Sequence, residues 1–459
     1  MTQTPPYQVT DPATGTVTET FPFATDAEVE QAIAAASAAF TEWRKRPVEE
    51  RAAIVKRVGE LFGERAAELG AIITKEMGKR PSQASGEAEF CNDIFGYYAD
   101  NGPTLLADKP LPGHDSARVE YLPVGPVLGV MPWNYPYYQV ARFAAPNLVA
   151  GNTVILKHAE NCPTSALAIA GIMREAGVPE GAYVNLFATH EQVAAMIADP
   201  RVRGVSLTGS ERAGTAVAET AGRNLKKVVL ELGGSDPYII LDSDDVDGAA
   251  KTAWITRMEN VGQACNSNKR MIVMDNIYDD FVAALVKRAS TATPREPGDD
   301  SARSYSPMVS RKAAENLLAQ VQDAVSKGAT LHVGGTLAEG KGAYFAPAVL
   351  TGVTPEMRAY REELFGPVAV VYKVTSDEEA VQLANAVDYG LGGAVWSTDE
   401  ARATAVAERL EVGMANVNTP AGEGADLPFG GTKRSGFGRE LGPLGIDEFI
   451  NKRLFYVEK

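Results

Sequence analysis

The sequence predicts an α/β protein with two parallel sheets, each covered by helices. The chain has 459 residues, 45% of them hydrophobic, which is enough for two or three domains with large cores. Between residues 127 and 231, short apolar runs alternate with helical segments. This alternation indicates a parallel sheet buried on both faces. A second alternation between 271 and 396 predicts a second α/β domain.

The region before the first alternation reads as short strands and then long helices. Residues 7–23 have a strand-like pattern. Thr25 is a polar cap, and Glu28 places an acid in the first turn of the helix that follows. Helical patterns continue through 26–101, and 117–131 reads as strand, turn and strand.

The first alternating region supplies the strands of one sheet and the helices that cover it. Its strands are expected at 153–156, 183–187, 204–207 and 227–231, and its helices at 164–176, 191–198 and 213–221. Parallel sheets of this kind bind ligands at the carboxyl ends of their strands. Chemically active residues are therefore expected at those ends.

The second alternating region has the same character. Its strands are expected at 271–274, 331–333, 369–372 and 394–396, and its helices at 279–290, 310–327 and 376–387. A last strand-like run, 453–457, lies at the end of the chain. A lone edge strand is a candidate for pairing with another subunit.

Composition excludes several classes of function. A net charge of -15 argues against a nucleic acid or an anionic membrane as partner. The cysteines at 91, 162 and 265 are odd in number and widely spaced, which fits neither a disulfide framework nor a zinc site. We expect no metal. The amino terminus lacks the pattern of a secretory signal, and no apolar run is long enough for a membrane helix, so we expect a cytoplasmic protein.

Cys265 is the most informative single residue. It lies on a loop of small residues, 260–268, between an apolar helical segment and a strand. Lys269 and Arg270 would favour the thiolate if they point toward it. A thiol titrates at about 8.5, so a local positive charge makes it a nucleophile at neutral pH. The alternative is a small buried core residue, which is the commoner role of a lone cysteine.

Two polar stretches near the first sheet suit catalysis. Asn134 lies in a turn between two prolines, where its amide can donate to an oxyanion. Asparagine in such turns more often bonds its own backbone. Glu231 follows a strand and precedes two glycines, and it is a candidate general base. The alternative for Glu231 is a turn cap.

Two other stretches suit a dinucleotide. Lys157 and Glu160 follow a strand, where the carboxylate can accept both hydroxyls of a ribose and would repel a 2′-phosphate. A solvated charge pair is equally compatible. Thr208, Gly209 and Ser210 lead from a strand into a helix, whose N-terminus favours a pyrophosphate. The spacing is not GxGxxG, so this signal alone is weak.

In their order and spacing, these motifs resemble the aldehyde dehydrogenase superfamily over nearly the whole chain. The resemblance is closest to the shorter bacterial succinate-semialdehyde dehydrogenases. The motifs are PWN-P at 132–136, K-AE at 157–160, TGS at 208–210, ELGG at 231–234, GQ-C at 262–265, E-FGP at 363–367 and PFGG-K-SG-GRE at 428–440.

The resemblance implies an aldehyde dehydrogenase-like fold. Residues 1–103 and 127–231 would form a Rossmann-like NAD(P)-binding domain, and 232–445 a catalytic domain. Residues 104–126 and 446–459 would form oligomerisation strands. Such chains are homodimers or homotetramers.

The resemblance also implies residue roles. Cys265 would attack the aldehyde and give a thiohemiacetal, with its oxyanion held by Asn134 and the Cys265 N–H. Hydride transfer would leave a thioester, and Glu231 would activate the water that hydrolyses it. The cofactor would be NAD, with NADP as the alternative. Its binding residues would be Trp133, Lys157, Glu160, Thr208, Gly209, Ser210, Leu232, Glu363 and Phe365.

The substrate is expected to be succinate semialdehyde. Arg142 lies eight residues after Asn134 and is the candidate clamp for a distal carboxylate. A second arginine expected six residues before Cys265 is replaced by Glu259, and Arg257 is the candidate that compensates for it. The expected substrate-binding residues are Arg142, Tyr138, Arg257 and Phe429.

Other functions stay open at this point. Tyr138 and Phe429 also suit glutarate semialdehyde or an aromatic aldehyde. A non-catalytic binding protein with this fold is a different class, and the intact Cys265, Glu231 and Asn134 argue against it. A cysteine hydrolase lacks support because no histidine lies in a base-like motif.

Overall fold

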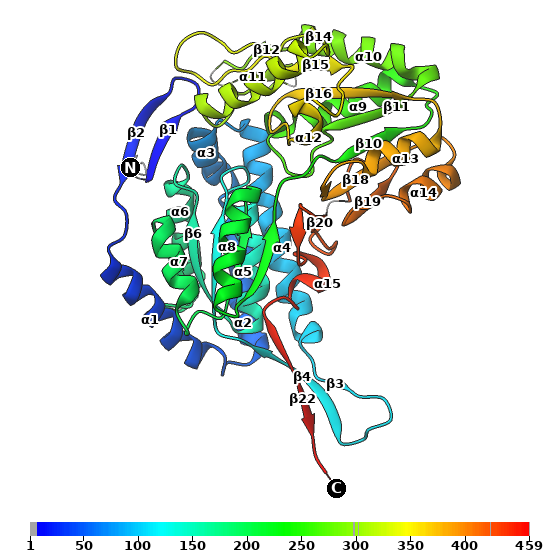
Figure 1. The fold of residues 1–459 in the computed structure, drawn as a ribbon. Coiled ribbons are helices and arrows are strands. Elements are labelled where there is room, and N and C mark those ends of the chain that lie inside the picture. The colour runs from blue at the N-terminus through cyan, green and yellow to red at the C-terminus, as the bar shows by residue number, and fades with distance from the viewer. Residues whose placement is uncertain (1–6, 297–298, 302, 423, 459) are drawn as a thin grey trace.

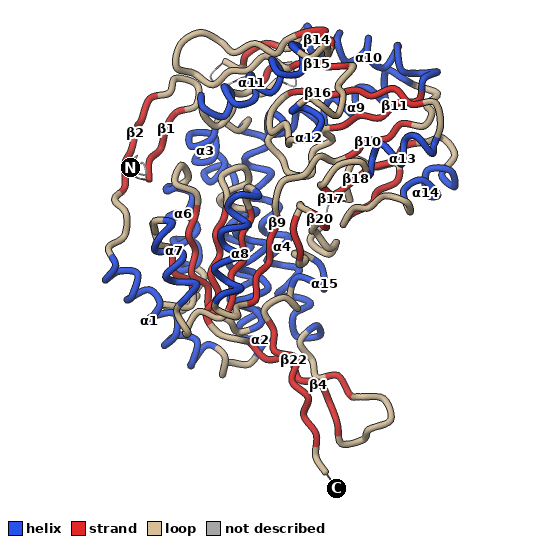
Figure 2. Tube along the Cα trace, viewed as in Figure 1, coloured by secondary structure: helices blue, strands red, loops and turns tan. Residues whose placement is uncertain are grey.

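A computed structural model describes residues 7–296, 299–301, 303–422 and 424–458. Residues 1–6 and 459 of the predicted domain ranges lie outside this part. Figure 1 shows two α/β bodies that meet along one side, and a narrow arm that projects away from them. The predicted fold class is confirmed. Figure 2 shows strands flanked by helices in both bodies.

The first body is built on a six-stranded sheet with the order β21-β9-β8-β5-β6-β7. Its strands are β5 (Pro126–Met131), β6 (Thr153–His158), β7 (Tyr183–Asn185), β8 (Gly204–Thr208), β9 (Lys227–Glu231) and β21 (Gly436–Phe437). The helices that alternate with them are α5 (Tyr138–Ala150), α6 (Pro163–Glu175), α7 (His190–Ala198) and α8 (Glu211–Arg223). All six residues of β6 are buried, as its apolar sequence predicts.

The order of this sheet reverses between β5 and β8. From β5 the chain moves outward to β6 and β7, and then returns to build β8 and β9 on the other side. Ligands of such sheets bind at the carboxyl ends of the strands beside this switch point. The parallel pairing places Trp133, Glu160, Thr208 and Glu231 along one edge, because each lies at or just after the end of its strand.

The second body contains a seven-stranded sheet with the order β14-β15-β16-β11-β10-β18-β19. Its strands are β10 (Pro237–Ile240), β11 (Arg270–Met274), β14 (Thr330–Val333), β15 (Ala348–Thr351), β16 (Val368–Val374), β18 (Gly392–Trp396) and β19 (Met414–Val417). Its helices are α9 (Val246–Met258), α10 (Asp275–Ser290), α11 (Arg311–Ser326), α12 (Arg358–Arg361), α13 (Asp377–Asn385) and α14 (Glu400–Ala407). Only the β14–β15 pairing is antiparallel among its described strand pairs.

The chain passes directly from one sheet to the other. Strand β9 ends at Glu231 and β10 begins at Pro237, so five residues join the sheets. The carboxyl edge of the first sheet therefore faces the amino edge of the second. Cys265 lies just before β11, at that amino edge. Ligand-binding residues are thus expected at the carboxyl ends of the strands in the first sheet. The predicted nucleophile, in contrast, lies before the amino end of β11 in the second sheet.

The helical pattern predicted for 26–101 resolves into four helices. They are α1 (Asp26–Trp43), α2 (Val48–Glu64), α3 (Ala66–Met77) and α4 (Pro81–Leu105), preceded by the hairpin of β1 (Tyr7–Asp11) and β2 (Thr16–Phe21). Thr25 and Glu28 form a reciprocal capping box at the start of α1, which confirms that helix start. Helix α4 packs against α5 and thereby supports the loop that contains Asn134.

The projecting arm is a three-stranded sheet of β3 (Lys109–Pro110), β4 (Ala117–Pro123) and β22 (Ile450–Tyr456). Strand β22 pairs with β4 and lies at the edge of this sheet. Its side chains Leu454 and Tyr456 are 62% and 52% exposed. Within the described ranges, no helix combines the length and the apolar character that crossing a membrane requires.

The remaining elements are short. They are β12 (Thr293–Pro294), β13 (Ser304–Tyr305), β17 (Tyr389–Gly390), β20 (Thr432–Lys433), the 3-10 helix η1 (Glu259–Gly262) and α15 (Gly442–Gly445). Strand β21 comes from the predicted catalytic range, yet it pairs with β9 of the first sheet. A boundary at residue 231 therefore does not separate the two sheets completely.

Candidate active site

The loop that holds the nucleophile, residues 259–269, has an unusual backbone. Asn260, Val261 and Gly262 have consecutive φ angles of 45°, 55° and 72°. A β-branched residue such as Val261 rarely adopts this left-handed conformation, which costs about 1–3 kcal/mol where it occurs. The Asn260 side-chain amide donates to Asn134 O at 2.9 Å and to Gln263 O at 3.1 Å. These bonds fix the tight turn between α9 and Cys265.

Arg257 holds the same turn from inside the protein. It is fully buried, and its guanidinium donates to Gly262 O (3.2 Å), Ser267 Oγ (2.9 Å), Val368 O (2.8 Å), Leu364 O (2.7 Å) and Gly366 O (2.6 Å). The prediction that Arg257 contacts the substrate is therefore wrong. Its donors are used by protein oxygens, and it does not line the cavity beside Cys265.

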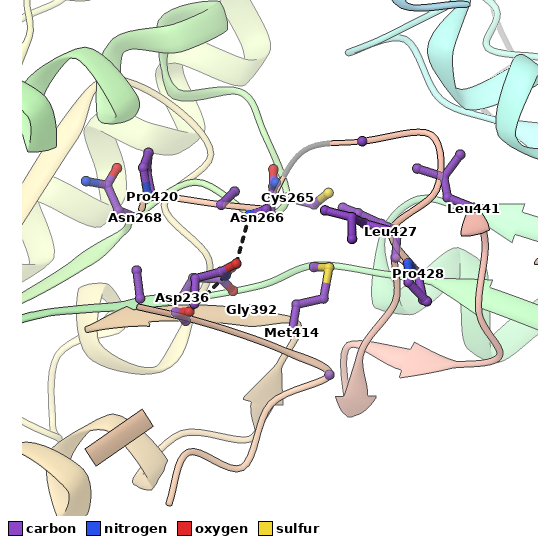
Figure 3. Close-up of a pocket in the computed structure, with 18 of the residues that line it drawn as sticks. Asp236, Cys265, Asn266, Asn268, Gly392, Met414, Pro420, Leu427, Pro428 and Leu441 are labelled. Carbon is purple, nitrogen blue, oxygen red and sulfur yellow. Dashed lines mark hydrogen bonds between the residues drawn. The ribbon is translucent and has the colours of Figure 1, made fainter. Parts of the chain in front are cut away.

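Cys265 lies in the wall of a cavity of about 690 Å³. Figure 3 shows its sulfur among cavity-lining side chains that include Leu427 and Met414. The predicted residues Tyr138 and Phe429 also line this cavity. Its volume lies in the range typical of small-molecule sites.

The electrostatics of Cys265 differ from the sequence-based expectation. Burial raises the pKa of its thiol to about 12, although the positive charges of Arg142 and Lys269 act in the opposite direction. Arg270 does not help, because its guanidinium points to Ala384 O and Leu383 O on α13. Loss of hydration thus outweighs the cations, and burial favours the neutral thiol over the thiolate.

Asn134 is buried against the nucleophile loop. Its amide nitrogen donates to Gln263 O at 3.2 Å, which leaves its second hydrogen for another acceptor. The turn that carries Asn134 is fixed by Glu87 of α4, whose Oε1 accepts from Tyr137 N at 2.8 Å and Tyr138 N at 3.2 Å. The structure thus brings Asn134 and the cysteine loop together, and Glu87 is a supporting residue that the sequence did not indicate.

Glu231 is a buried carboxyl group at the end of β9, with 1% exposure. Neither of its oxygens has a hydrogen-bond partner among the described residues. Burial and the nearby Glu440 raise its pKa well above the usual range, against the charges of Arg142 and Arg439. The backbone of Gly430 lies so close that an added Cβ would be 2.7 Å from Glu231 Oε1. An unpartnered carboxyl with a raised pKa suits a general base.

Arg142 lies behind two residues of the cavity wall. Its guanidinium carbon is 4.6 Å from the Tyr138 ring centre and 4.3 Å from that of Phe429. Its Nε is 2.9 Å from Glu440 Oε2, and its other nitrogens donate to Gln139 Oε1 and Tyr138 OH, so its charged partner in this structure is a protein carboxylate. A substrate carboxylate would compete with Glu440 for this arginine. Glu440 was not among the predicted site residues, although it ends the GRE sequence of the quoted motif.

Lys157 and Glu160 form an ion pair at the end of β6. Although burial raises the pKa of Glu160, Lys157 outweighs it, and the net pKa lies below the usual range. His190 Nε2 is 3.5 Å from the same carboxylate. Glu160 therefore presents a negative charge at the edge of the sheet where a dinucleotide would bind.

The predicted phosphate residues lie between β8 and α8. Ser210 is the N-cap of α8, and its Oγ accepts from Ala213 N at 3.4 Å. Gly209 N donates to Glu231 O at 2.9 Å, and Thr208 Oγ1 is buried without a partner in the described part of the chain. Leu232 is buried and adjoins this edge. A helix N-terminus with its backbone N–H groups favours an anion here.

The last predicted pair, Glu363 and Phe365, comes from the second body. The Phe365 ring contacts that of Trp133 edge to face, with 5.6 Å between the ring centres. Glu363 Oε1 is 3.0 Å from Lys269 Nζ and accepts from Gly234 N at 3.2 Å. These contacts bring Trp133 of the first body together with Phe365 of the second, and they place Glu363 beside Lys269, four residues after Cys265.

Comparison with known proteins agrees with this arrangement. Residues 1–454 match the model of the aldehyde dehydrogenase family. A succinate-semialdehyde dehydrogenase [NADP(+)] of Deinococcus radiodurans is 54% identical over 450 residues, which cover 98% of this chain and 94% of that protein. The protein of the same name from Mycobacterium avium is 42% identical over 457 residues, covering 98% and 97%.

Solved structures give the same result. Succinic semialdehyde dehydrogenase from Streptococcus pyogenes, in complex with NADP+, has a TM-score of 0.95 at 42% identity and covers 99% of this chain and 100% of that one. Betaine aldehyde dehydrogenase from Staphylococcus aureus, in complex with NAD+, has a TM-score of 0.93 at 30% identity, covering 97% and 90%. The resemblance seen in the sequence is confirmed, and the chain belongs to the aldehyde dehydrogenase family.

Proposed function

We propose that this protein oxidises a short carboxylated aldehyde, foremost succinate semialdehyde, to the acid with a nicotinamide dinucleotide. The observation that carries the proposal is the junction of the two sheets. There a cavity-lining cysteine lies near an unpartnered carboxyl group, Glu231, and near Glu363, which the family resemblance gives to the cofactor. The names of the relatives support the substrate.

In this proposal Cys265 attacks the aldehyde carbon as a thiolate and gives a thiohemiacetal. The oxyanion receives hydrogen bonds from the Asn134 amide and the Cys265 N–H, and one such donor contributes about 2.7–4 kcal/mol. A bound nicotinamide supplies the acceptor for the hydride, which leaves a thioester on Cys265. Glu231 then takes a proton from the water that hydrolyses the thioester. Its buried, unpartnered oxygens are free for that water.

Either NAD or NADP suits the predicted cofactor residues, since both contain the pyrophosphate that Ser210 and the N-terminus of α8 would bind. The relatives are named for NADP(+), and NAD+ is bound in a more distant structure. In this proposal the ionised Glu160 accepts hydrogen bonds from the adenosine ribose. We therefore propose NAD as the preferred cofactor and NADP as the slower one.

Two cations, one in the cavity wall and one buried behind it, are candidates for a distal carboxylate. Arg439 is the positively charged residue among its described lining residues, and Arg142 lies behind Tyr138 and Phe429. The same aromatic walls suit an uncharged aldehyde. The substrate class is therefore tested with succinate semialdehyde, glutarate semialdehyde and benzaldehyde, each scored by kcat/KM with both cofactors. Selection of benzaldehyde over both semialdehydes would contradict the proposal.

The Cys265→Ala variant tests the nucleophile. It should lose aldehyde oxidation while it still binds the dinucleotide, because Cys265 is not needed for cofactor binding in this scheme. Nucleotide binding measured by calorimetry distinguishes a lost nucleophile from a misfolded protein. Aldehyde oxidation that survives in this variant would remove Cys265 from the mechanism.

We also propose that the arm mediates homo-oligomer formation, as dimer or tetramer. Strand β22 has a free edge in the described structure, and Leu454 and Tyr456 expose large apolar surface there. Light scattering of the Leu454→Glu variant should show a smaller assembly than the wild-type protein. An unchanged mass would contradict the role of β22.

A further inference from the structure

Lys269 connects the nucleophile to a predicted cofactor residue. Its side chain is 1% exposed. Its ammonium donates to Ala264 O at 2.7 Å and to Cys265 O at 2.7 Å, and it lies 3.0 Å from Glu363 Oε1. A lysine ammonium has three hydrogens, and these three oxygens use all of them. The side chain thus spans two loops that are almost one hundred residues apart in sequence.

Glu363 is also fixed from the other side. Its Oε1 accepts from Gly234 N at 3.2 Å, and an added Cβ on Gly233 would lie 2.5 Å from its Oε2. The Glu363 side chain is nevertheless partly exposed, at 20%, so a ligand at the junction of the two bodies can reach its carboxylate. A ligand hydroxyl that donates to Glu363 would share this carboxylate with Lys269.

The Lys269–Glu363 pair affects the charge balance around the Cys265 thiol. Arg142 and Lys269 lower the pKa of the thiol, whereas Glu363 and Glu231 raise it. Tyr138 also faces the thiol, and Asp236 faces Lys269. Through its ion pair with Lys269, Glu363 neutralises part of the positive charge that Lys269 directs at Cys265.

We propose that Lys269 is a positioning residue that couples occupancy of the ribose site at Glu363 to ionisation of Cys265. The inference rests on the proposed function, since it takes Glu363 as the residue that binds the nicotinamide ribose. When ribose hydroxyls donate to Glu363, its negative charge is dispersed and its hold on Lys269 weakens. The ammonium keeps its hydrogen bonds to the carbonyls of Ala264 and Cys265. Because Glu363 then offsets less of its positive charge, Lys269 stabilises the Cys265 thiolate more strongly.

Arg257 provides the structural contrast. It joins the same two loops through backbone oxygens, at Gly262, Leu364 and Gly366, and the charge of Glu363 acts on it without a hydrogen bond between the two described side chains. Arg257 therefore fixes the two loops regardless of what is bound. Lys269 is placed to respond to the ligand, because one of its three partners is itself a predicted ligand-binding group.

The test measures the pKa of Cys265 from the pH dependence of its alkylation by iodoacetamide. The wild-type protein is compared alone, with saturating ADP-ribose and with saturating ADP. ADP-ribose contains the second ribose and reaches Glu363, whereas ADP ends at the pyrophosphate. Use of the pKa in place of a single rate avoids confusion with steric shielding of the sulfur.

In the wild-type protein we expect ADP-ribose to lower the pKa by about one unit, the lower end of the effect of one nearby charge, and ADP to leave it unchanged. In Lys269→Met the ADP-ribose shift should fall below half of the wild-type shift. Lys373→Met is the matched control, because Lys373 is an exposed lysine on β16 paired with Asp279, and it should keep the full shift.

A wild-type pKa that ADP-ribose does not move, or an undiminished shift in Lys269→Met, would overturn the proposal. If Lys269→Met does not fold, Glu363→Gln provides the same comparison, since it keeps the shape and removes the charge. Loss of the shift in Glu363→Gln supports the coupling, and an unchanged shift overturns it. Aldehyde oxidation is assayed in parallel. A wild-type enzyme that is active but shows no shift refutes the coupling alone, whereas failure to oxidise any aldehyde refutes the proposed function.

Discussion

Replacement of Glu160 by serine should reverse the cofactor preference. The carboxylate is ionised, partly buried at 30% exposure and paired with Lys157. In the proposed complex it accepts both hydroxyls of the adenosine ribose of NAD. A 2′-phosphate would place about two negative charges beside it. Serine removes the repulsion and releases Lys157, which is then free to pair with that phosphate.

Two effects determine how far the Glu160→Ser substitution changes the ratio of kcat/KM for NAD to that for NADP. A hydrogen bond to a charged group contributes about 1.5–3 kcal/mol, so loss of the Glu160 bonds should weaken the use of NAD at least tenfold. Two unit charges ~4 Å apart interact by about 4 kcal/mol near a protein surface, and screening by salt reduces this repulsion further. We take about 1.5–3 kcal/mol as the relief for NADP. Together these contributions amount to about 3–6 kcal/mol, so the ratio of kcat/KM for NAD to that for NADP should fall about 100- to 10,000-fold.

The assay is the initial rate of reduced-nicotinamide formation with succinate semialdehyde, measured with each cofactor over a range of concentrations. Glu175→Ser is the matched control, because Glu175 ends α6 at the opposite edge of the sheet. Its cofactor ratio should stay within a factor of about two, since screening weakens a charge effect over that distance. A wild-type enzyme that is faster with NADP, or a Glu160→Ser ratio that does not change, would refute the role given to this carboxylate.

Three further predictions concern buried groups. Arg257→Met should lower the free energy of unfolding by about 3–5 kcal/mol, since it removes five buried hydrogen bonds from a charged donor, and a denaturant midpoint like that of wild type would contradict this. Burial lowers the pKa of His158 to about 4, so the unfolded chain binds a proton below pH ~6.5 that the folded protein refuses. Stability should therefore fall by about 3 kcal/mol between pH ~6.5 and 4, and His158→Gln should show a flatter pH profile of unfolding than wild type. Arg142→Ala should raise KM about tenfold or more for succinate semialdehyde but not for benzaldehyde, because only the former offers a carboxylate. An equal change in KM for succinate semialdehyde and benzaldehyde would contradict a role of Arg142 in binding the substrate carboxylate.

Much of the fold could be predicted from local patterns. The strands that were expected in the two sheets begin and end within two residues of their observed bounds, because buried parallel strands have continuous apolar sequences, but β10, β15 and β19 were not among the expected strands. The helix that starts after Thr25 was predictable from its cap. The pairing of β21 with β9 in the first sheet could not be predicted, since a two-residue strand has no periodic pattern.

The candidate site could be located but not fully described from the sequence. The motifs indicated Cys265, Asn134 and Glu231, and the structure brings Asn134 to the loop of Cys265. The environment of Arg257 depends on carbonyls more than one hundred residues away, which no local pattern reveals. The pKa of Cys265 is a balance between burial and nearby charges, and the sequence shows only the charges. The left-handed backbone at Val261 is equally hidden, because valine does not favour it.

The proposed mechanism requires that Cys265 carries the substrate as a thioester that Glu231 helps to hydrolyse. Its most direct test is a Glu231→Gln variant mixed with succinate semialdehyde and NAD, followed by mass spectrometry of the protein and its peptides. We predict one equivalent of reduced cofactor per active chain, formed rapidly, and a succinyl group attached to Cys265. Reduced cofactor without any adduct on Cys265, or an adduct on a different residue, would contradict the mechanism.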